Sequence, residues 1–524
     1  MIYNGIMVSL VRPPIVATLR SVNNEATPSV AFSLISAYLR SKGYLTCIVD
    51  GIAEGLNRLW PLAEFPGYQC QGATLDEIVG LIPSDSSVIG FSATFSGEWP
   101  VARLLIRKVR QRFPNALLVA GGEHITALTE YSLRDCTDLD VCVRGEGERA
   151  MHEICEARRI GGDYSQIAGA AYLDVVNAYV EAKPERIRDI SALPWPDWPE
   201  GYLEKFWAAG KSYGVQSERD MPIMASRGCP FQCTFCSSSH MWTNRYVLRE
   251  IEDLIAEIKS YVKRYNITAL QFYDLTAITK KRWTMEFCQR LIDEGLGHLS
   301  WSLPSGTRSE SLDAEVLAML KRTNCNYLVY TPESGSPETL AIIKKRMSLD
   351  KLTQSVMEAK RLGIVVRTNL IIGFPHETRR HVFETIRYGL YLAWNGADEV
   401  SINIFSPYPG TDIFATLLSE GKITLGDDYF MALTSLNSDY TVLNPMTCND
   451  FLGKREMAVY RIGFMLLNYI VGYIRYPSRI LRTIRNILFD DRTATVFEHR
   501  IKDMLAKAIG IRKAQTNPRS VSKQ

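Results

Sequence analysis

Short apolar runs alternate with helix-forming segments along most of this 524-residue chain, and the alternation limits the fold more than any other feature. Segments such as 28–43 and 100–113 carry apolar residues at helical spacing. Five runs with the length of buried strands occur in the first part, at 6–11, 44–50, 87–93, 116–122 and 139–143. Because buried strands joined by helices form parallel sheets, we predict an N-terminal α/β domain with a doubly wound parallel sheet.

A second series of strand-like runs follows, again with helical segments between them. Six such runs occur, at 221–225, 268–273, 299–303, 326–330, 364–372 and 399–405. Six β/α units predict an open, partial (β/α)6 barrel. Catalytic groups in β/α barrels lie at the carboxyl ends of the strands, so the residues that follow each run are the first candidates for a site.

Three cysteines follow the first barrel strand in a C-x3-C-x2-C spacing: Cys229, Cys233 and Cys236. A structural zinc site or an ordinary ferredoxin cluster uses four protein ligands, whereas a catalytic metal centre keeps one position open. We interpret the three thiolates as ligands of an iron–sulfur cluster with one vacant iron. The alternative is a zinc site completed by His240.

The spacing, with Phe235 before the last cysteine, resembles the signature of the radical S-adenosylmethionine (SAM) superfamily. In that family the cysteines hold a [4Fe–4S] cluster, and the fourth iron binds the amino and carboxylate groups of SAM. The resemblance implies that Cys229, Cys233 and Cys236 are the metal ligands and the catalytic centre. It also implies reductive cleavage of SAM to a 5′-deoxyadenosyl radical, with the electron from a flavodoxin or ferredoxin type of reductant.

The ends of the later barrel strands resemble further segments of this superfamily, which implies a set of SAM contacts. They are Phe235, Asp274, Glu333, Ser334, Gly335, Asn369, Gly373 and Pro407. Two departures stand out. Thr331 and Pro332 replace the usual Gly-Ile before Glu333, and Leu275 stands where a second aspartate follows the first. The second departure leaves the role of Asp274 open.

Small and flexible residues collect at the carboxyl ends of the N-terminal strands, where such sheets bind ligands. This layout resembles the cobalamin-binding domain that precedes many radical SAM domains. The cobalamin contacts that it implies are Pro13, Ser92, Thr94, Gly121, Gly122, His124, Gly145 and Glu146. A dinucleotide site is the alternative, but no G-x-G-x-x-G follows a strand. His124 is either a cofactor contact or a hydrogen-bonded loop histidine.

No histidine of the chain has an aspartate two positions before it, so the D-x-H-x-x-G motif of better-known cobalamin domains is absent. We therefore predict that no histidine from such a motif ligates the cobalt. Electron paramagnetic resonance of the Co(II) form would contradict this by showing nitrogen splitting from a lower axial ligand.

The predicted domain organisation has five parts: 1–165 (cobalamin-binding domain), 166–215 (linker), 216–425 (partial barrel), 426–512 (helical C-terminal domain) and 513–524 (disordered tail). Three prolines within 190–199 give the linker its stiffness.

An almost wholly apolar segment at 461–474 is too short to span a membrane. It is followed by Arg475, Arg479, Arg482 and Arg485, which share one helical face. We expect a cap on the barrel with a solvated basic face; the alternative is contact with anionic lipid or with a lipid-like substrate.

The composition of the chain excludes several classes of protein. With 46% hydrophobic and 22% charged residues and a net charge of +3, the chain is globular and gives no case for nucleic-acid binding. Most of its eleven cysteines are scattered, which favours a reducing cytoplasm. Residues 1–11 have no basic segment and no cleavage site and predict a strand rather than a signal peptide. The sequence contains no apolar run of about 18 residues, so it predicts no membrane-spanning helix.

Together the resemblances imply a cobalamin-dependent radical SAM enzyme that acts on a small-molecule or lipid-like substrate. The leading hypothesis is methylation of an unactivated carbon. The alternative is a cyclase or another carbon-skeleton rearrangement without methyl transfer, because the C-P-F-x-C-x-F-C loop also resembles the anaerobic magnesium-protoporphyrin monomethyl ester cyclase branch. A third hypothesis, a cobalamin-binding sensor with an inactive barrel, is opposed by the three intact cysteines.

Overall fold

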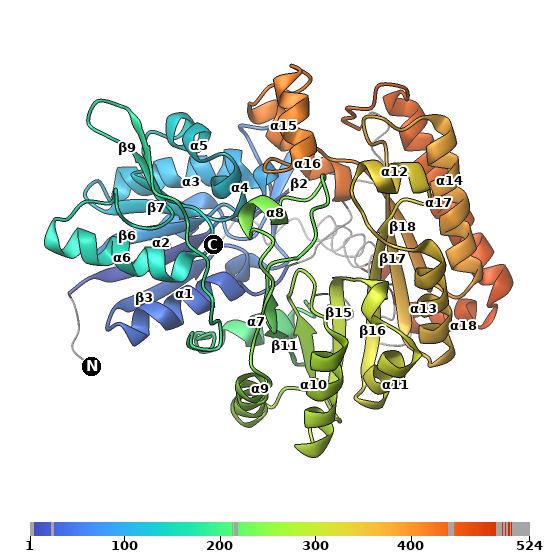
Figure 1. Ribbon diagram of the computed structural model, residues 1–524. Helices are drawn as coiled ribbons and strands as arrows, with labels where there is room; N and C mark the ends of the chain where they lie inside the picture. Colours follow the sequence, from blue (N-terminus) through green and yellow to red (C-terminus); the bar gives the residue numbers. More distant parts are fainter. Residues whose placement is uncertain are drawn as a thin grey trace, which may run out of the picture.

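The computed structural model describes residues 5–21, 26–211, 213, 218–438 and 445–488, with single residues at 495, 498, 501, 502 and 505. The predicted tail, 513–524, lies outside this part of the chain. Two parallel sheets form the two main bodies, an N-terminal sheet and a barrel-like sheet, with further helices at one side (Figure 1).

The N-terminal sheet has seven strands in the order β10-β9-β8-β7-β6-β1-β3. Its five parallel strands confirm the predicted doubly wound sheet: β1 (Met7–Arg12), β3 (Leu45–Asp50), β6 (Ser86–Ser92), β7 (Leu117–Gly121) and β8 (Val141–Val143). The strand order reverses between β1 and β6, and α/β sheets bind ligands at the carboxyl end of such a point.

Helices cover both faces of this sheet because alternate strand residues point to opposite sides. On one face, α1 (Val30–Ser41) and α6 (Gly147–Ile160) bury Phe32 and Met151 against Leu10. On the other face, α2 (Leu75–Leu81) and α3 (Trp99–Arg112) bury Ile78 and Leu105 against Ile89. Sequence signals begin two of these helices: Ser29 caps α1, and Thr74 with Glu77 forms a capping box on α2.

The N-terminal sheet continues beyond its predicted end at residue 165. An antiparallel hairpin, β9 (Ala170–Leu173) and β10 (Tyr179–Glu181), adds its edge, so 166–181 does not belong to a linker. The hairpin is too short to show strand periodicity, and it is closed by Asp174, whose carboxylate accepts bonds from the amides of Val176 and Ala178. A second unpredicted feature is a small antiparallel sheet of β2 (Ile15–Thr18), β4 (Leu59–Pro61) and β5 (Tyr68–Gln71).

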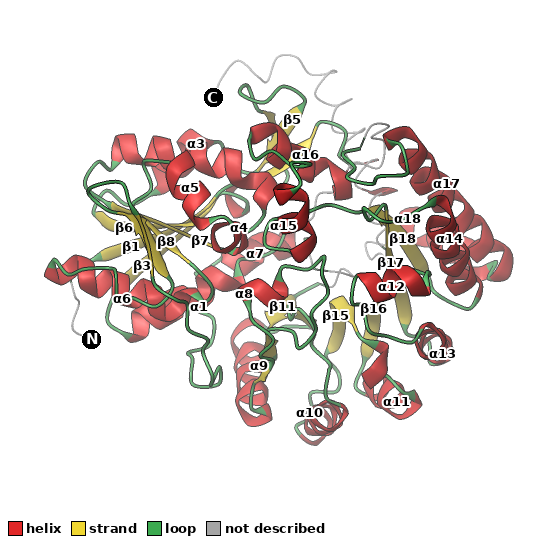
Figure 2. Ribbon diagram, turned by 45° about the horizontal axis from the view of Figure 1, so that its top comes forward, coloured by secondary structure: helices red, strands yellow, loops and turns green. Residues whose placement is uncertain are grey.

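The second large sheet has six parallel strands in sequential order, as the six apolar runs predicted (Figure 2). The strands are β11 (Asp220–Ile223), β14 (Ala269–Phe272), β15 (Ser300–Thr307), β16 (Cys325–Glu333), β17 (Val365–Ile372) and β18 (Glu399–Ile404). The helices between them are α9 (Ile251–Tyr265), α10 (Lys281–Asp293), α11 (Ala314–Arg322), α13 (Leu349–Arg361) and α14 (Arg379–Trp394). Within the described residues β11 and β18 do not pair, so the barrel is open.

Shorter elements join these bodies. They are α4 (Glu123–Ala127), α5 (Thr129–Asp135), α7 (Tyr202–Ala208), β12 (Ser226–Arg227), α8 (Ser238–Met241), β13 (Val247–Leu248), α12 (Pro337–Ile342) and α15 (Asp412–Ser419). Helix α16 (Asp427–Ser438) contacts the N-terminal domain, where Asp427 pairs with Arg103 at 2.7 Å. The start of the predicted C-terminal domain therefore lies between the two bodies, where α16 packs against β2 and α3 of the N-terminal domain and against β18 of the barrel.

Helix α17 (Lys454–Arg475) covers α14 and β18 as the expected cap, and α18 (Ser478–Leu488) packs against α17. Helix α17 begins seven residues before the predicted segment, and its 22 residues meet the length and composition of a membrane span, contrary to the sequence prediction. Length and composition are the only criteria that it meets. Its buried face carries Arg461 and Asn468 and packs against the rest of the chain.

The predicted solvated basic face is only partly present: Arg475 and Arg485 are exposed, but Arg479 and Arg482 on α18 are turned toward the protein. Arg479 is buried, donates to the backbone carbonyls of Gly396 and Ala397, and pairs with Asp398 at 3.2 Å. Arg482 reaches the same carboxylate at 3.1 Å. The apolar face is turned to solvent instead, with Leu481 72% and Leu488 64% exposed. The Asp398 carboxylate and the carbonyls of Gly396 and Ala397 need hydrogen-bond donors because they are buried, and the arginines supply them. This requirement outweighs the burial of the leucine side chains.

Candidate active site between the two sheets

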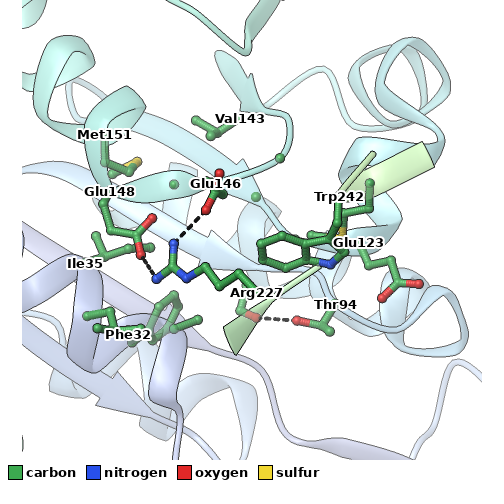
Figure 3. A pocket seen from close by; sticks show the side chains of 18 of the residues that line it. Phe32, Ile35, Thr94, Glu123, Val143, Glu146, Glu148, Met151, Arg227 and Trp242 are labelled. Atoms are coloured by element: carbon green, nitrogen blue, oxygen red, sulfur yellow. Dashed lines mark hydrogen bonds and ion pairs between the residues drawn. The ribbon is translucent and has the colours of Figure 1, made fainter. Parts of the chain in front are cut away.

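A cavity of about 300 Å³ lies where the carboxyl ends of the N-terminal strands meet the first barrel strands. Six predicted cobalamin residues line it from the N-terminal side: Ser92, Thr94, Gly121, Gly122, Gly145 and Glu146. The barrel side contributes Ser226, Arg227, Gly228 and Asp274. Figure 3 shows the Arg227 guanidinium directed between Glu146 and Glu148, with Trp242 and Glu123 at the other end of the view.

Two predicted cobalamin residues do not line this cavity. Pro13 is buried in the loop after β1. The His124 ring is 1% exposed and turned away, with its nitrogens 2.9 Å from the Ser96 hydroxyl and 3.3 Å from the Ser132 hydroxyl. Burial lowers the pKa of His124 to about 3, so the ring is neutral. The structure therefore favours the second interpretation of His124, a hydrogen-bonded core histidine.

Glu123, which sequence reasoning did not select, faces the cavity in place of His124. Its carboxylate accepts a hydrogen bond from the hydroxyl of Ser237, the residue after Cys236. Burial raises the pKa of Glu123, while the bond from Ser237 works in the opposite direction. The preceding Gly122 has φ 116°, and a Cβ there would lie 2.6 Å from the Ala93 carbonyl, so only glycine allows this turn.

The loop with the three cysteines begins after β12 at Gly228, whose φ is 84°. A Cβ at this position would lie 2.3 Å from the Arg245 carbonyl, so the loop can turn here only with glycine. The loop is then held by two neighbouring segments. The Thr234 amide donates to the Ile343 carbonyl, and the Thr234 carbonyl accepts from the Ile413 amide, each at 3.1 Å.

The three thiols lie in different surroundings. The Ser238 hydroxyl is 3.2 Å from the Cys236 sulfur, and the Thr276 hydroxyl is 3.7 Å from the Cys229 sulfur. Burial raises the pKa of Cys233, and the nearby Lys345 and Arg308 counteract this by favouring the thiolate.

This donor set fits a cluster better than a single ion. Within the part of the chain that the structure describes, no three His, Cys, Asp or Glu side chains are close enough to hold one metal ion. His240, the proposed fourth zinc ligand, pairs with Asp412 at 2.7 Å and is largely exposed. Three cysteines spread along one loop suit the wider spacing of an iron–sulfur cluster.

Asp274 lies at the end of β14 beneath the cysteine loop and faces the cavity. Its carboxylate accepts bonds from the Ser226 hydroxyl at 2.5 Å and the Ala225 amide at 3.1 Å. Burial raises the pKa of Asp274 to about 6, although these bonds favour the ionised form. The aspartate therefore ties β14 to the strand that leads into the cysteine loop.

The segment at the end of β16 is packed on the barrel wall rather than directed into this cavity. Glu333, in the left-handed conformation with φ 68°, pairs with the buried Lys345 at 2.9 Å. The Ser334 hydroxyl is 2.9 Å from that of Thr385 on α14. Gly335 lies so close to α14 that a Cβ would come within 2.4 Å of Tyr388.

The remaining predicted SAM residues fall around the same barrel mouth. Phe235 packs edge-on against Phe374 at 5.7 Å between ring centroids, and Phe374 follows Gly373 at the end of β17. Asn369 accepts a hydrogen bond from Ser401 on β18. The Pro407 carbonyl accepts a bond from Tyr429 on α16.

Arg227 joins the two halves of the site. It contacts Glu146 at 2.8 Å and Glu148 at 2.5 Å, and its side chain is only 6% exposed. Burial alone would lower the pKa of Arg227, but Glu148 and Glu146 raise it above its usual value. Arg186 binds the second oxygen of Glu146 at 2.9 Å and donates to the Trp242 carbonyl. The sequence offered one signal for this network: charged residues adjoin both motifs, in R-G-E-G-E and S-R-G-C.

Comparisons with known proteins match both halves of this site. A family model described as the B12 binding domain matches residues 18–155, and one described as the Radical SAM superfamily matches residues 223–389. The chain is a cobalamin-binding radical SAM enzyme. The family assignment brings a [4Fe–4S] cluster, SAM and cobalamin as its cofactors.

Several proteins resemble this enzyme over most of its length. An uncharacterized methyltransferase of Pyrococcus horikoshii is 28% identical over 91% of this chain and 94% of its own. An anaerobic magnesium-protoporphyrin IX monomethyl ester cyclase of Rubrivivax gelatinosus is 25% identical over 86% of this chain and 75% of its own.

Two solved structures share the fold at 14% sequence identity. OxsB, a cobalamin-dependent SAM radical enzyme, has a TM-score of 0.65 and covers 98% of this chain and 81% of its own. The radical SAM methyltransferase TsrM of Kitasatospora setae has a TM-score of 0.59 and covers 89% of each chain.

The residues present fit these cofactors. Glycines at the ends of β7 and β8 leave the sheet edge open, and Phe32, Ile35 and Met151 give the cavity an apolar wall for a large ring system. On the other side, the loop offers the three cysteines as thiolate donors, and His240, the candidate fourth ligand, is paired with Asp412.

Proposed function

We propose that this enzyme methylates an unactivated carbon of a small-molecule substrate. The observation that carries the proposal is the shared cavity: residues of the cobalamin-type sheet edge and residues that flank the three cysteines, Arg227, Gly228 and Trp242, line one space. A methyl carrier and a radical generator must both reach the same substrate, and one cavity between their binding sites allows this.

When bound, the cluster supplies the electron that cleaves SAM, and the corrinoid supplies a carrier for the methyl group. The chain holds the two sites in register. Arg227 connects the cysteine loop to Glu146 and Glu148, and Glu123 reaches Ser237 on the far side of the loop.

For the individual contacts we propose that Ser92, Thr94, Gly121, Gly122, Gly145 and Glu146 approach the corrinoid, joined by Glu123. On the SAM side we propose Phe235, Asp274, Glu333, Gly335, Asn369, Gly373 and Pro407. Ser334 would contribute through its backbone, because its hydroxyl is bonded to Thr385. Pro13 and His124 support the loops without a contact of their own.

Names of relatives support methyl transfer and also its alternative. A cytidylyl-2-hydroxyethylphosphonate methyltransferase and a hopanoid C-3 methylase are 25% and 26% identical to this chain, whereas other relatives are magnesium-protoporphyrin ester cyclases. The second candidate function is therefore cyclisation or another rearrangement without methyl transfer. A sensor with an inactive barrel receives no support, since the three cysteines are intact.

The test does not require the substrate. Holoenzyme reconstituted under anaerobic conditions is reduced and given SAM with a deuterated methyl group. Methyl transfer predicts equal amounts of deuterated methyl in the corrinoid fraction and of S-adenosylhomocysteine. Formation of 5′-deoxyadenosine with an unlabelled corrinoid fraction would overturn methyl transfer and favour the second candidate function.

As a radical SAM enzyme the protein needs an external one-electron reductant. We propose a flavodoxin or ferredoxin type, no nucleic-acid partner and a cytoplasmic location.

We also propose peripheral contact with an anionic membrane through the outer face of α17 and α18. That face exposes apolar side chains at helical spacing, and the exposed Arg475 and Arg485 adjoin it.

Vesicle sedimentation tests the membrane contact. Leu481→Asp with Leu488→Asp should release the protein from vesicles that contain phosphatidylglycerol, because both side chains lie on the exposed face. Unchanged sedimentation would contradict the contact. A concentration-dependent dimer lost in the same variant would show that a second copy covers the face.

A further inference from the structure

We propose that exposed cations around the outer tip of the cysteine loop form the docking surface for an acidic one-electron donor protein of the flavodoxin or ferredoxin class. The cations are Arg245, Lys280, Lys344 and Arg346. This inference rests on the radical SAM assignment and not on methyl transfer.

The cysteine loop has an inner side and an outer tip. On the inner side, Arg227 and Gly228 line the cavity, and Ser237 is bonded to Glu123 of the N-terminal domain. The outer tip, between Cys229 and Cys233, exposes Pro230 and Gln232. Because the inner side serves the cofactors and substrate, the tip is the side on which a protein can approach.

The segment 343–346 lies against this tip. The Thr234 amide binds the Ile343 carbonyl at 3.1 Å. Arg308 binds the Arg346 carbonyl at 2.6 Å, and its guanidinium lies 3.5 Å from the ring centroid of Phe231 in the loop. The segment is therefore in direct contact with the loop on the Cys233 side.

Within this segment the basic side chains have two different roles. Lys345 is buried and paired with Glu333, so it is part of the barrel wall. Lys344, in the left-handed conformation with φ 54°, and Arg346 are both exposed. One lysine is thus neutralised inside, while the residues on either side of it present charge to solvent.

The Cys229 side of the loop carries cations as well. Gly228 touches the backbone of Arg245, and the Thr276 hydroxyl lies 3.7 Å from the Cys229 sulfur, four residues before Lys280. Arg245 and Lys280 are exposed. Among the residues that the structure describes, none of the four cations forms an ion pair, and the nearby exposed acid, Glu310, is paired with Arg308.

Unpaired charge of one sign around a small target steers a partner of the opposite sign to it. The partner that this chemistry fits is an acidic electron carrier. One electron would pass from the reduced donor to the oxidised cluster that Cys229, Cys233 and Cys236 would hold, and no bond or proton would be exchanged. Neutralising pairs would have weakened the field, so their absence around the tip supports a docking role.

The double variant Lys344→Glu/Arg346→Glu tests the proposal. Reconstituted holoenzyme is mixed with a recombinant bacterial flavodoxin hydroquinone, and cluster reduction is followed by stopped-flow absorbance and by electron paramagnetic resonance. We expect reduction by flavodoxin to slow about tenfold or more at low salt, with loss of most of its salt dependence. Reduction by dithionite should keep its wild-type rate.

A matched control carries the same change of charge elsewhere. Lys263→Glu/Arg264→Glu alters two exposed cations at the end of α9, which leads into the opposite end of the barrel strands. It should reduce the flavodoxin rate less than twofold. An unchanged flavodoxin rate in the Lys344/Arg346 variant would overturn the proposal, and so would an equal loss with dithionite, because the residues would then act on the cluster itself.

Failure of the methyl-transfer proposal would look different. An enzyme that performs cyclisation would still show the flavodoxin-specific loss in the Lys344/Arg346 variant. The affinity for oxidised flavodoxin, measured by calorimetry, gives a readout without turnover and should fall in the same variant.

Discussion

The cysteines of the chain separate into ligands and core residues by their surroundings. Cys233 adjoins Lys345 and Arg308, whereas Cys288 is buried in the apolar barrel core. We predict that Cys233→Ala lowers iron and sulfide content after reconstitution and abolishes formation of 5′-deoxyadenosine, since a three-cysteine site has no spare ligand. Cys288→Ala should retain both. Retained SAM cleavage in Cys233→Ala would contradict the cluster assignment.

Glu377 is a buried carboxylate that holds the turn after β17. It accepts bonds from the amides of Gly373, at 2.6 Å, and Phe374, at 3.2 Å. Burial raises its pKa from the usual 4.5 to about 7, so the folded state binds a proton that the unfolded state has released between these pH values.

This shift predicts a pH-dependent stability. The contribution of Glu377 is full below pH 4.5 and is lost as pH rises through 7, by about 3 kcal/mol in all. Glu377→Gln should remove that loss. The free energy of unfolding of the variant, measured with denaturant, should therefore rise relative to that of the wild type from pH 5 to pH 8. A constant difference across this range would contradict the raised pKa.

At the residue scale, the sequence placed the site but not the side chains within it. Strand ends and motif spacing were sufficient to bring Asp274, Gly121 and Gly145 to one cavity, because backbone topology places the ends of parallel strands together. They were not sufficient for His124 and Glu123. Which of two adjacent residues faces a cavity depends on the turn at Gly122, and no motif reports that turn.

Helix α18 is held by its arginines. Arg479 makes two bonds to backbone carbonyls and one to Asp398, all away from solvent. We predict that Arg479→Ala destabilises the docking of α18 by about 3 kcal/mol, since it removes one partner of a buried ion pair. Arg485→Ala, on an exposed position of the same helix, should change stability by less than about 0.5 kcal/mol. Thermal unfolding of both variants is the measurement, and equal midpoints would contradict the buried role.

At the element scale, parallel strands within the β/α alternation were predictable and antiparallel pairings outside it were not. Short apolar runs in the sequence predicted all six barrel strands and the five parallel strands of the first sheet. The hairpin β9–β10 and the sheet β2–β4–β5 pair antiparallel and lie outside the alternation that identified the equally short β8, β11 and β14. The sequence also could not predict which face of α18 contacts the protein, because an amphipathic pattern is the same whichever face is turned inward.

The two sheets are joined in the centre of the molecule by the Arg227 network. We predict that Arg227→Met destabilises the apo protein by about 3 to 5 kcal/mol, because Glu146 and Glu148 would remain buried without a partner. Adding Glu148→Gln should recover part of this loss, so the double-mutant cycle should give a coupling energy of at least about 1 kcal/mol. Additive effects would show that the contact does not couple the domains.

The cavity itself has a thermodynamic consequence, because neither sheet encloses it alone. A corrinoid bound at the glycine edge and SAM bound at the cysteine loop would both favour the observed packing of the two sheets around the cavity. By linkage, each ligand then raises the affinity for the other by one common factor. Calorimetric titration of cobalamin with and without SAM would measure that factor, and the reverse titration must return the same number.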